Sequence, residues 1–141
     1  MHGTHVVKTW SSTQATVALS SGEAEYSADV KAASVLLGFR SLLADLGVVP
    51  ASCHLHTDSS AALGVANRTG IGKIRHLAVH LLWLQEKVKN GDIQMYKVPG
   101  SCNPADVLTK HVTNDCMTKH LHALCMCFSS GRASVAPQAL I

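Results

Sequence analysis

The chain has 141 residues, 47% of them hydrophobic and 15% charged, with a formal net charge of +3 at pH 7. This composition is typical of a globular protein and excludes a disordered chain, and the length fits one domain. No apolar run approaches the ~18 residues of a membrane-spanning helix, and the N-terminus lacks the apolar segment of a signal peptide, so we expect an intracellular protein. Five cysteines, an odd number, argue against a disulfide framework.

The first long element is a helix predicted over about 21–46. Residues 5–19 before it are expected to be extended, as a bent strand or a hairpin. Ser20 and Glu23 have the spacing of a capping box, so Ser20 is the expected N-cap. Gly47 is the expected C′ residue.

Glu25 is the unusual residue of this helix. It lies three residues before Ala28, which begins an apolar stripe at helical spacing, so we expect it on the inward face. An inward carboxylate needs a hydrogen-bond donor, a cation or a metal. The alternative is a solvated acid that favours the helix dipole.

The rest of the chain alternates strand and helix patterns. Short patterns of both kinds follow in order, over 53–58 (strand), 59–66 (helix), 75–90 (helix), 93–98 (strand) and 103–111 (helix). Such alternation predicts an α/β layer structure with crossover helices. Residues 113–128 fit one more helix, and 129–141 are expected to be a disordered tail.

Three carboxylates, Glu25, Asp58 and Asp106, fall at the ends of predicted elements. Asp58 ends a strand, and the other two lie in first turns of helices. Ligands of α/β sheets gather where strands end and helices begin, and oxygen ligands of this kind suit Mg²⁺. Each acid taken alone also fits helix capping.

Several motifs carry a resemblance that covers about residues 6–112. They are KTWSSTQ (8–14), VALSSGEAEY (17–26), TDSSAA (57–62), IRHL (74–77), EKV (86–88) and NPADVLTK (103–110). In this order and spacing, the chain resembles the ribonuclease H domain of copia-type LTR retrotransposon Pol polyproteins.

The resemblance implies a fold, an activity and partners. The fold is a ribonuclease H-like mixed sheet flanked by helices, as a domain over 1–112. The activity is Mg²⁺-dependent hydrolysis of the RNA strand of an RNA–DNA hybrid, with Glu25, Asp58 and Asp106 as catalytic and metal-binding acids of a two-ion site. Expected partners are the hybrid and the rest of Pol (reverse transcriptase and integrase), without a membrane, in the cytoplasm or a virus-like particle.

The chain departs from the family pattern at its start. The family has a fourth acid on its opening strand, whereas residues 1–22 contain no Asp or Glu. We therefore expect a domain that lacks the first strand and most of the second and cleaves RNA poorly by itself. The alternatives are a non-catalytic nucleic-acid-binding remnant and a fragment without function.

Two further clusters have open roles. The basic residues Arg68, Lys73, Arg75 and His76 are expected to contact phosphates of the hybrid, or else to form an ordinary solvated loop. A Cys/His-rich segment over 116–127 has ligand types that zinc prefers, but no standard zinc spacing.

Overall fold

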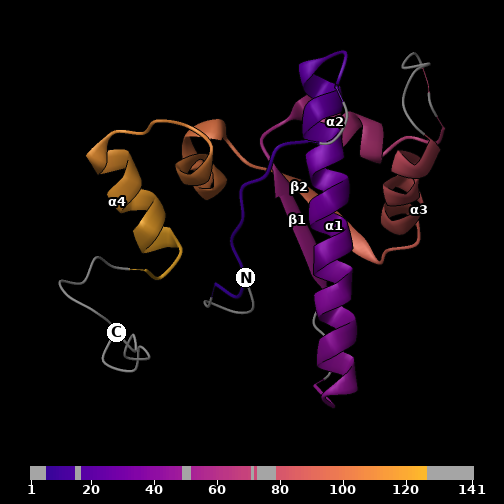
Figure 1. Ribbon diagram of the computed structural model, residues 1–141. Coiled ribbons are helices and arrows are strands. Elements are labelled where there is room, and N and C mark those ends of the chain that lie inside the picture. The colour runs from indigo at the N-terminus through magenta and orange to yellow at the C-terminus, as the bar shows by residue number, and fades with distance from the viewer. Residues whose placement is uncertain (1–5, 15–16, 49–51, 71, 73–78, 127–141) are drawn as a thin grey trace, which may run out of the picture. The chain divides into compact units, whose positions relative to one another are not determined.

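The computed structural model describes residues 6–14, 17–48, 52–70, 72 and 79–126 (Figure 1). It divides into two compact units, here named the sheet unit (Ser12–Asn103) and the terminal unit (Met1–Ser11 with Pro104–Ile141). The expected domain over 1–112 stays a prediction.

The sheet unit contains a two-stranded parallel sheet and helices. The sheet pairs β1 (Cys53–Thr57) with β2 (Ile93–Lys97). The helical elements are α1 (Ser21–Asp45), α2 (Ser60–Ala66), the 3₁₀ helix η1 (Val79–Leu82), α3 (Trp83–Lys89) and the 3₁₀ helix η2 (Gly100–Cys102). This small sheet flanked by helices confirms the α/β class and is compatible with a ribonuclease H-like fold.

Helix α1 has the ends that its sequence predicts. The Ser20 hydroxyl accepts from the Glu23 N–H at 3.2 Å, so Ser20 is the N-cap. Gly47 has φ +76°, and the N–H groups of Gly47 and Val48 donate to the carbonyls of Ala44 and Leu43, which is a Schellman motif. No strand is assigned to the described part of residues 6–20, so the expected strand or hairpin there is wrong within that part.

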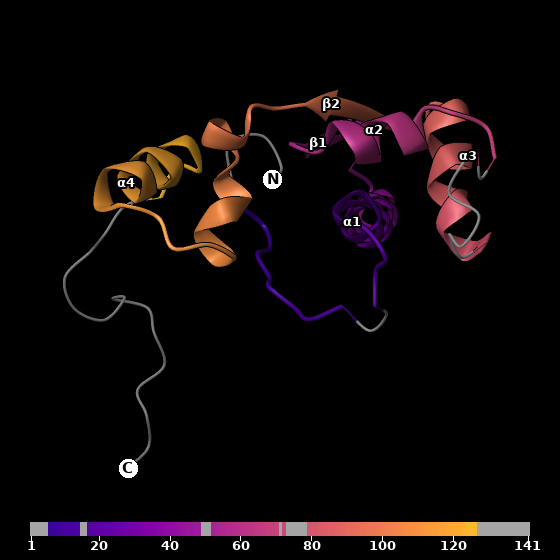
Figure 2. The same ribbon diagram turned by 90° about the horizontal axis from the view of Figure 1, so that it is seen from above.

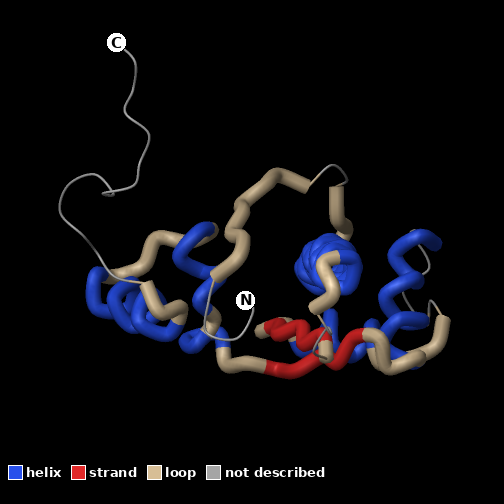
Figure 3. The backbone as a smooth tube through the Cα atoms, turned by 90° about the horizontal axis from the view of Figure 1, so that it is seen from below, coloured by secondary structure: helices blue, strands red, loops and turns tan. Residues whose placement is uncertain are grey.

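The sheet presents one buried face. Alternate residues Cys53, Leu55 and Thr57 of β1 are buried, as the alternating sequence predicts. Figures 2 and 3 show α1 lying over one side of the sheet, and α3 lying beside the sheet and extending toward the same side. The residues of the sheet unit's core are Tyr26, Ala33, Cys53, Leu55, Ala62, Val65, Ala66, Leu81, Leu84 and Ile93.

Polar contacts connect these elements. The buried Tyr26 hydroxyl donates to the Leu81 carbonyl at 2.8 Å, which joins α1 to η1. Asp92 pairs with Lys87 at 3.1 Å and with Arg40 at 3.3 Å, and these cations lower its pKa.

The terminal unit is smaller. It contains the 3₁₀ helix η3 (Pro104–Leu108) and α4 (Asn114–Ala123), which lies inside the 113–128 range. The expected tail over 129–141 lies outside the described residues. No helix in the described parts of the chain is long and apolar enough to span a membrane.

Candidate active site

Asp58 follows the last residue of β1, at the carboxyl end of the strand. The Ser59 hydroxyl accepts from the Ala62 N–H at 3.1 Å and thereby caps α2. The interpretation of Asp58 as the cap is therefore wrong. Its carboxylate lies next to η2, since a Cβ added at Gly100 would be 3.5 Å from Asp58 Oδ2.

Lys97 connects the ends of the two strands. Its ammonium donates to the Asp58 carbonyl at 2.9 Å and to the Ser60 hydroxyl. Because Lys97 lies at the end of β2 and Asp58 just beyond β1, these bonds fix the backbone around the acid. Sequence reasoning gave Lys97 no role.

Glu25 is exposed, contrary to the expected inward position. The buried residues of α1 are Glu23, Tyr26, Asp29 and Ala33. The prediction of an inward Glu25 was wrong because the apolar stripe was extended back to Ala28, which is also exposed. In the first three turns the buried face is instead formed largely by polar side chains.

Glu23 has the capping role that its position predicts, with one difference. Its Oε2 accepts the N–H of Leu19 at 2.8 Å, one residue before the N-cap. A capping box would direct this carboxylate to the N–H of Ser20. The acid nevertheless satisfies a backbone donor at the start of α1.

Asp29 is an acid that the sequence interpretation did not single out. Its side chain is 8% exposed, and its Oδ2 is buried without a hydrogen-bond partner. Burial raises the pKa of Asp29 from 3.8 to about 7; the Thr57 hydroxyl opposes this rise, and the negative charges of Glu25 and Asp58 add to it. The negative charges of Glu25 and Asp58 are therefore close enough to Asp29 to raise its pKa.

Asp106 belongs to the terminal unit. It lies in η3 and pairs with Lys110, one helical turn later, at 3.0 Å. Glu25 and Asp58 belong to the sheet unit, so the three predicted acids are divided between the two units. Among the residues that the structure describes, no group of three or more His, Cys, Asp or Glu side chains is arranged to hold a metal ion.

The segment that contains Arg68, Lys73, Arg75 and His76 is here named the basic loop. Its start is held by Gln85 of α3. This buried amide donates to the Val65 carbonyl at 2.8 Å and to the Gly70 carbonyl at 3.0 Å, and it accepts the Gly70 N–H at 2.9 Å. The Arg68 guanidinium packs on Gly72, where an added Cβ would be 2.7 Å from one nitrogen. The other three basic residues proposed to bind phosphate, Lys73, Arg75 and His76, lie outside the described residues.

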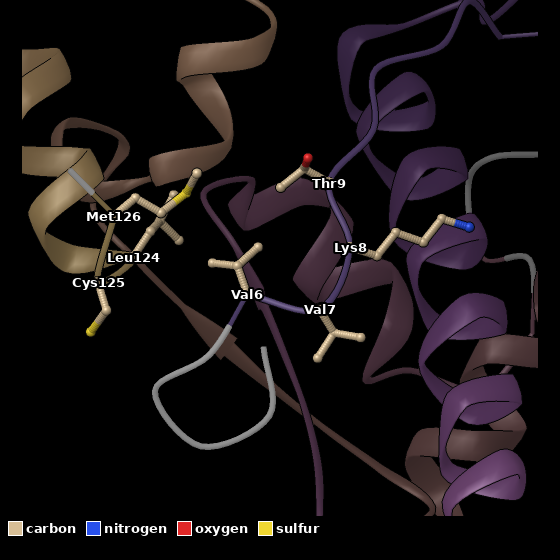
Figure 4. Close-up of a pocket in the computed structure, with 7 residues that line it drawn as sticks. All are labelled: Val6, Val7, Lys8, Thr9, Leu124, Cys125 and Met126. Carbon is tan, nitrogen blue, oxygen red and sulfur yellow. The ribbon is translucent and has the colours of Figure 1, made fainter. Parts of the chain in front are cut away.

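The terminal unit contains a thiol–imidazole pair and a pocket. Cys116 Sγ lies 3.3 Å from Nε2 of the buried His120 on α4. A separate pocket of about 380 Å³ is lined by Val6, Val7, Lys8, Thr9, Leu124, Cys125 and Met126 (Figure 4). None of the predicted site residues lines it.

The chain is similar to the "Retrovirus-related Pol polyprotein from transposon TNT 1-94" of Nicotiana tabacum, with 31% identity over 100 residues. The match covers 70% of this chain, which spans only about 8% of the length of that relative. No family model matches the chain, and no solved structure matches it. The chain is therefore a partial homologue of a retrotransposon Pol polyprotein.

Proposed function

We propose that the chain is a ribonuclease H-like part of a retrotransposon Pol polyprotein and acts on RNA–DNA hybrids. The observation that carries the proposal is the acidic group at the carboxyl end of β1, in a chain that is homologous to Pol. Asp58 lies where α/β sheets bind ligands, and Glu25 is within electrostatic reach of the same region. The α/β arrangement is compatible with this function.

The proposed reaction is hydrolysis of the RNA strand. Glu25, Asp58 and Asp106 are the proposed ligands of Mg²⁺, which when bound would neutralise phosphate charge and lower the pKa of the attacking water. Lys97 holds the backbone at Asp58 and so orients its carboxylate. We expect slow cleavage by this polypeptide alone, because residues 1–22 offer no acid to supply the fourth carboxylate.

Binding without cleavage is the second candidate function. The observation in its favour is the pair of hydrogen bonds between the Gln85 amide and the Gly70 backbone, which hold the start of the basic loop. Arg68, Lys73, Arg75 and His76 would contact phosphates through charge, and the affinity for nucleic acid would fall as the salt concentration rises.

A hybrid-cleavage assay tests the proposal. The complete chain is incubated with Mg²⁺ and a hybrid labelled on the RNA strand, beside Asp58→Asn and the matched control Asp45→Asn, which changes an exposed acid at the end of α1. The proposal expects slow Mg²⁺-dependent cleavage that leaves 5′-phosphate and 3′-hydroxyl ends, lost in Asp58→Asn and kept in Asp45→Asn. Salt-sensitive hybrid binding without any cleavage would favour the second candidate, and absence of both would overturn both.

A further inference from the structure

Asp29 has a carboxylate oxygen that the fold itself does not satisfy. The side chain is 8% exposed, and Oδ2 has no hydrogen-bond partner. A buried polar atom without a partner destabilises a folded protein by about 1–3 kcal/mol, and by more if it is charged. Such an atom indicates either a site that binds an ion or another ligand, or a carboxyl group that stays protonated.

The surroundings of Asp29 are acidic. It lies one helical turn after Glu25, at the i,i+4 spacing that places two side chains on neighbouring positions of a helix surface. The hydroxyl of Thr57, the last residue of β1 and the residue directly before Asp58, lowers the pKa of Asp29. Thr57 Oγ1 already accepts the Ser59 N–H at 3.3 Å, which leaves its own hydrogen free to point toward Asp29.

Among the described residues, the recorded contacts of Lys97 are with groups other than the three carboxylates. Lys97 donates to the backbone carbonyl of Asp58 and to Ser60. A buried carboxylate oxygen without a hydrogen-bond partner, close to the negative charges of two further acids, is a suitable ligand for a small divalent cation.

We propose that Asp29 is a further protein ligand of the divalent cation proposed at Asp58 and Glu25. The inference rests on the proposed function in one respect, since it adds a residue to the site proposed for Mg²⁺. Magnesium commonly uses only one or two carboxylates and completes its shell with water and phosphate oxygens. A site of this kind does not require three protein ligands already in place.

The test measures cation binding without nucleic acid. The complete chain is titrated with Mn²⁺ at pH 8, and free Mn²⁺ is followed by electron paramagnetic resonance. Asp29→Asn is compared with Asp45→Asn, which removes the same charge from an exposed position of the same helix. We expect Asp29→Asn to weaken Mn²⁺ binding at least tenfold and Asp45→Asn to change it less than twofold, with circular dichroism showing that both variants are folded.

The outcomes separate this inference from the proposed function. Unchanged Mn²⁺ binding by Asp29→Asn, or no binding by the unaltered chain, would overturn the inference and leave a protonated structural carboxyl as the explanation. Asp29-dependent binding by a chain that neither cleaves nor binds the hybrid would support the cation site and refute the proposed function. Hybrid cleavage together with Mn²⁺ binding that does not depend on Asp29 would support the proposed function and overturn Asp29 as a cation ligand.

Discussion

Replacing Asp29 by asparagine should change how the stability of the chain depends on pH. Burial raises the pKa of Asp29 from 3.8 to about 7 in the folded chain. The unfolded chain therefore releases this proton at lower pH than the folded chain does, so the free energy of unfolding falls as pH rises from about 4 to about 7. Below pH 4 both states are protonated and the effect disappears.

The magnitude follows from the shift. A rise of about three pKa units, at about 1.4 kcal/mol per unit, corresponds to on the order of 4 kcal/mol of lost stability at pH 8. Asparagine cannot ionise and does not suffer this loss. Any constant cost of the amide, such as an unsatisfied N–H, is the same at every pH and does not affect the slope.

The assay is urea unfolding followed by circular dichroism at several pH values between 4 and 8, with EDTA present to exclude cations. The measured quantity is the difference in unfolding free energy between Asp29→Asn and the unaltered chain. We expect this difference to grow in favour of the variant by on the order of 4 kcal/mol from pH 4 to pH 8. A difference that stays constant across this range would refute the reasoning, since it would mean that Asp29 ionises as readily in the folded chain as in the unfolded one. Asp45→Asn should give no comparable slope.

Three substitutions test other contacts. Ser20→Ala should destabilise the chain by about 1 kcal/mol in urea unfolding, because α1 loses its N-cap hydrogen bond; an unchanged midpoint would contradict the cap. Tyr26→Phe should cost about 1–3 kcal/mol, because it leaves the buried Leu81 carbonyl without its donor, and the same measurement would show no effect if water replaced the hydroxyl. Gln85→Ala should increase the hydrogen-exchange rate of the Gly70 amide by tenfold or more, and unchanged protection would show that Gln85 does not hold the loop.

Local signals in the sequence predict much of the sheet unit. Ser20 and Gly47 mark the two ends of α1 because a hydroxyl can satisfy an N–H group and a glycine can adopt positive φ without strain. The alternation of Cys53, Leu55 and Thr57 predicts β1 and its buried face because side chains of a strand point alternately to opposite sides. These signals depend on neighbouring residues alone.

The acidic group was predicted less well because it depends on packing between distant segments. Asp29 has the appearance of an ordinary surface acid in a helix, and it is buried because α1 packs on other elements of the sheet unit. The spacing to Glu25 and to the buried Tyr26 is the one signal that could have found it. The error at Glu25 has another cause, since Ala28, the residue of the apolar stripe nearest to it, is itself exposed.

The two explanations of Asp29, a structural carboxyl and a cation ligand, require opposite protonation states in the folded chain. A structural carboxyl would stabilise the fold in its protonated form. Its replacement by asparagine would therefore leave the function of the site unchanged. A cation ligand must ionise, and its buried charge would destabilise the chain until a cation binds. Cation binding to the folded state alone would then restore about 2.7 kcal/mol at a hundredfold excess over Kd. Asp29→Asn would thus be the more stable protein in EDTA and would gain less than the unaltered chain when Mn²⁺ is added, a combination that a purely structural acid does not produce.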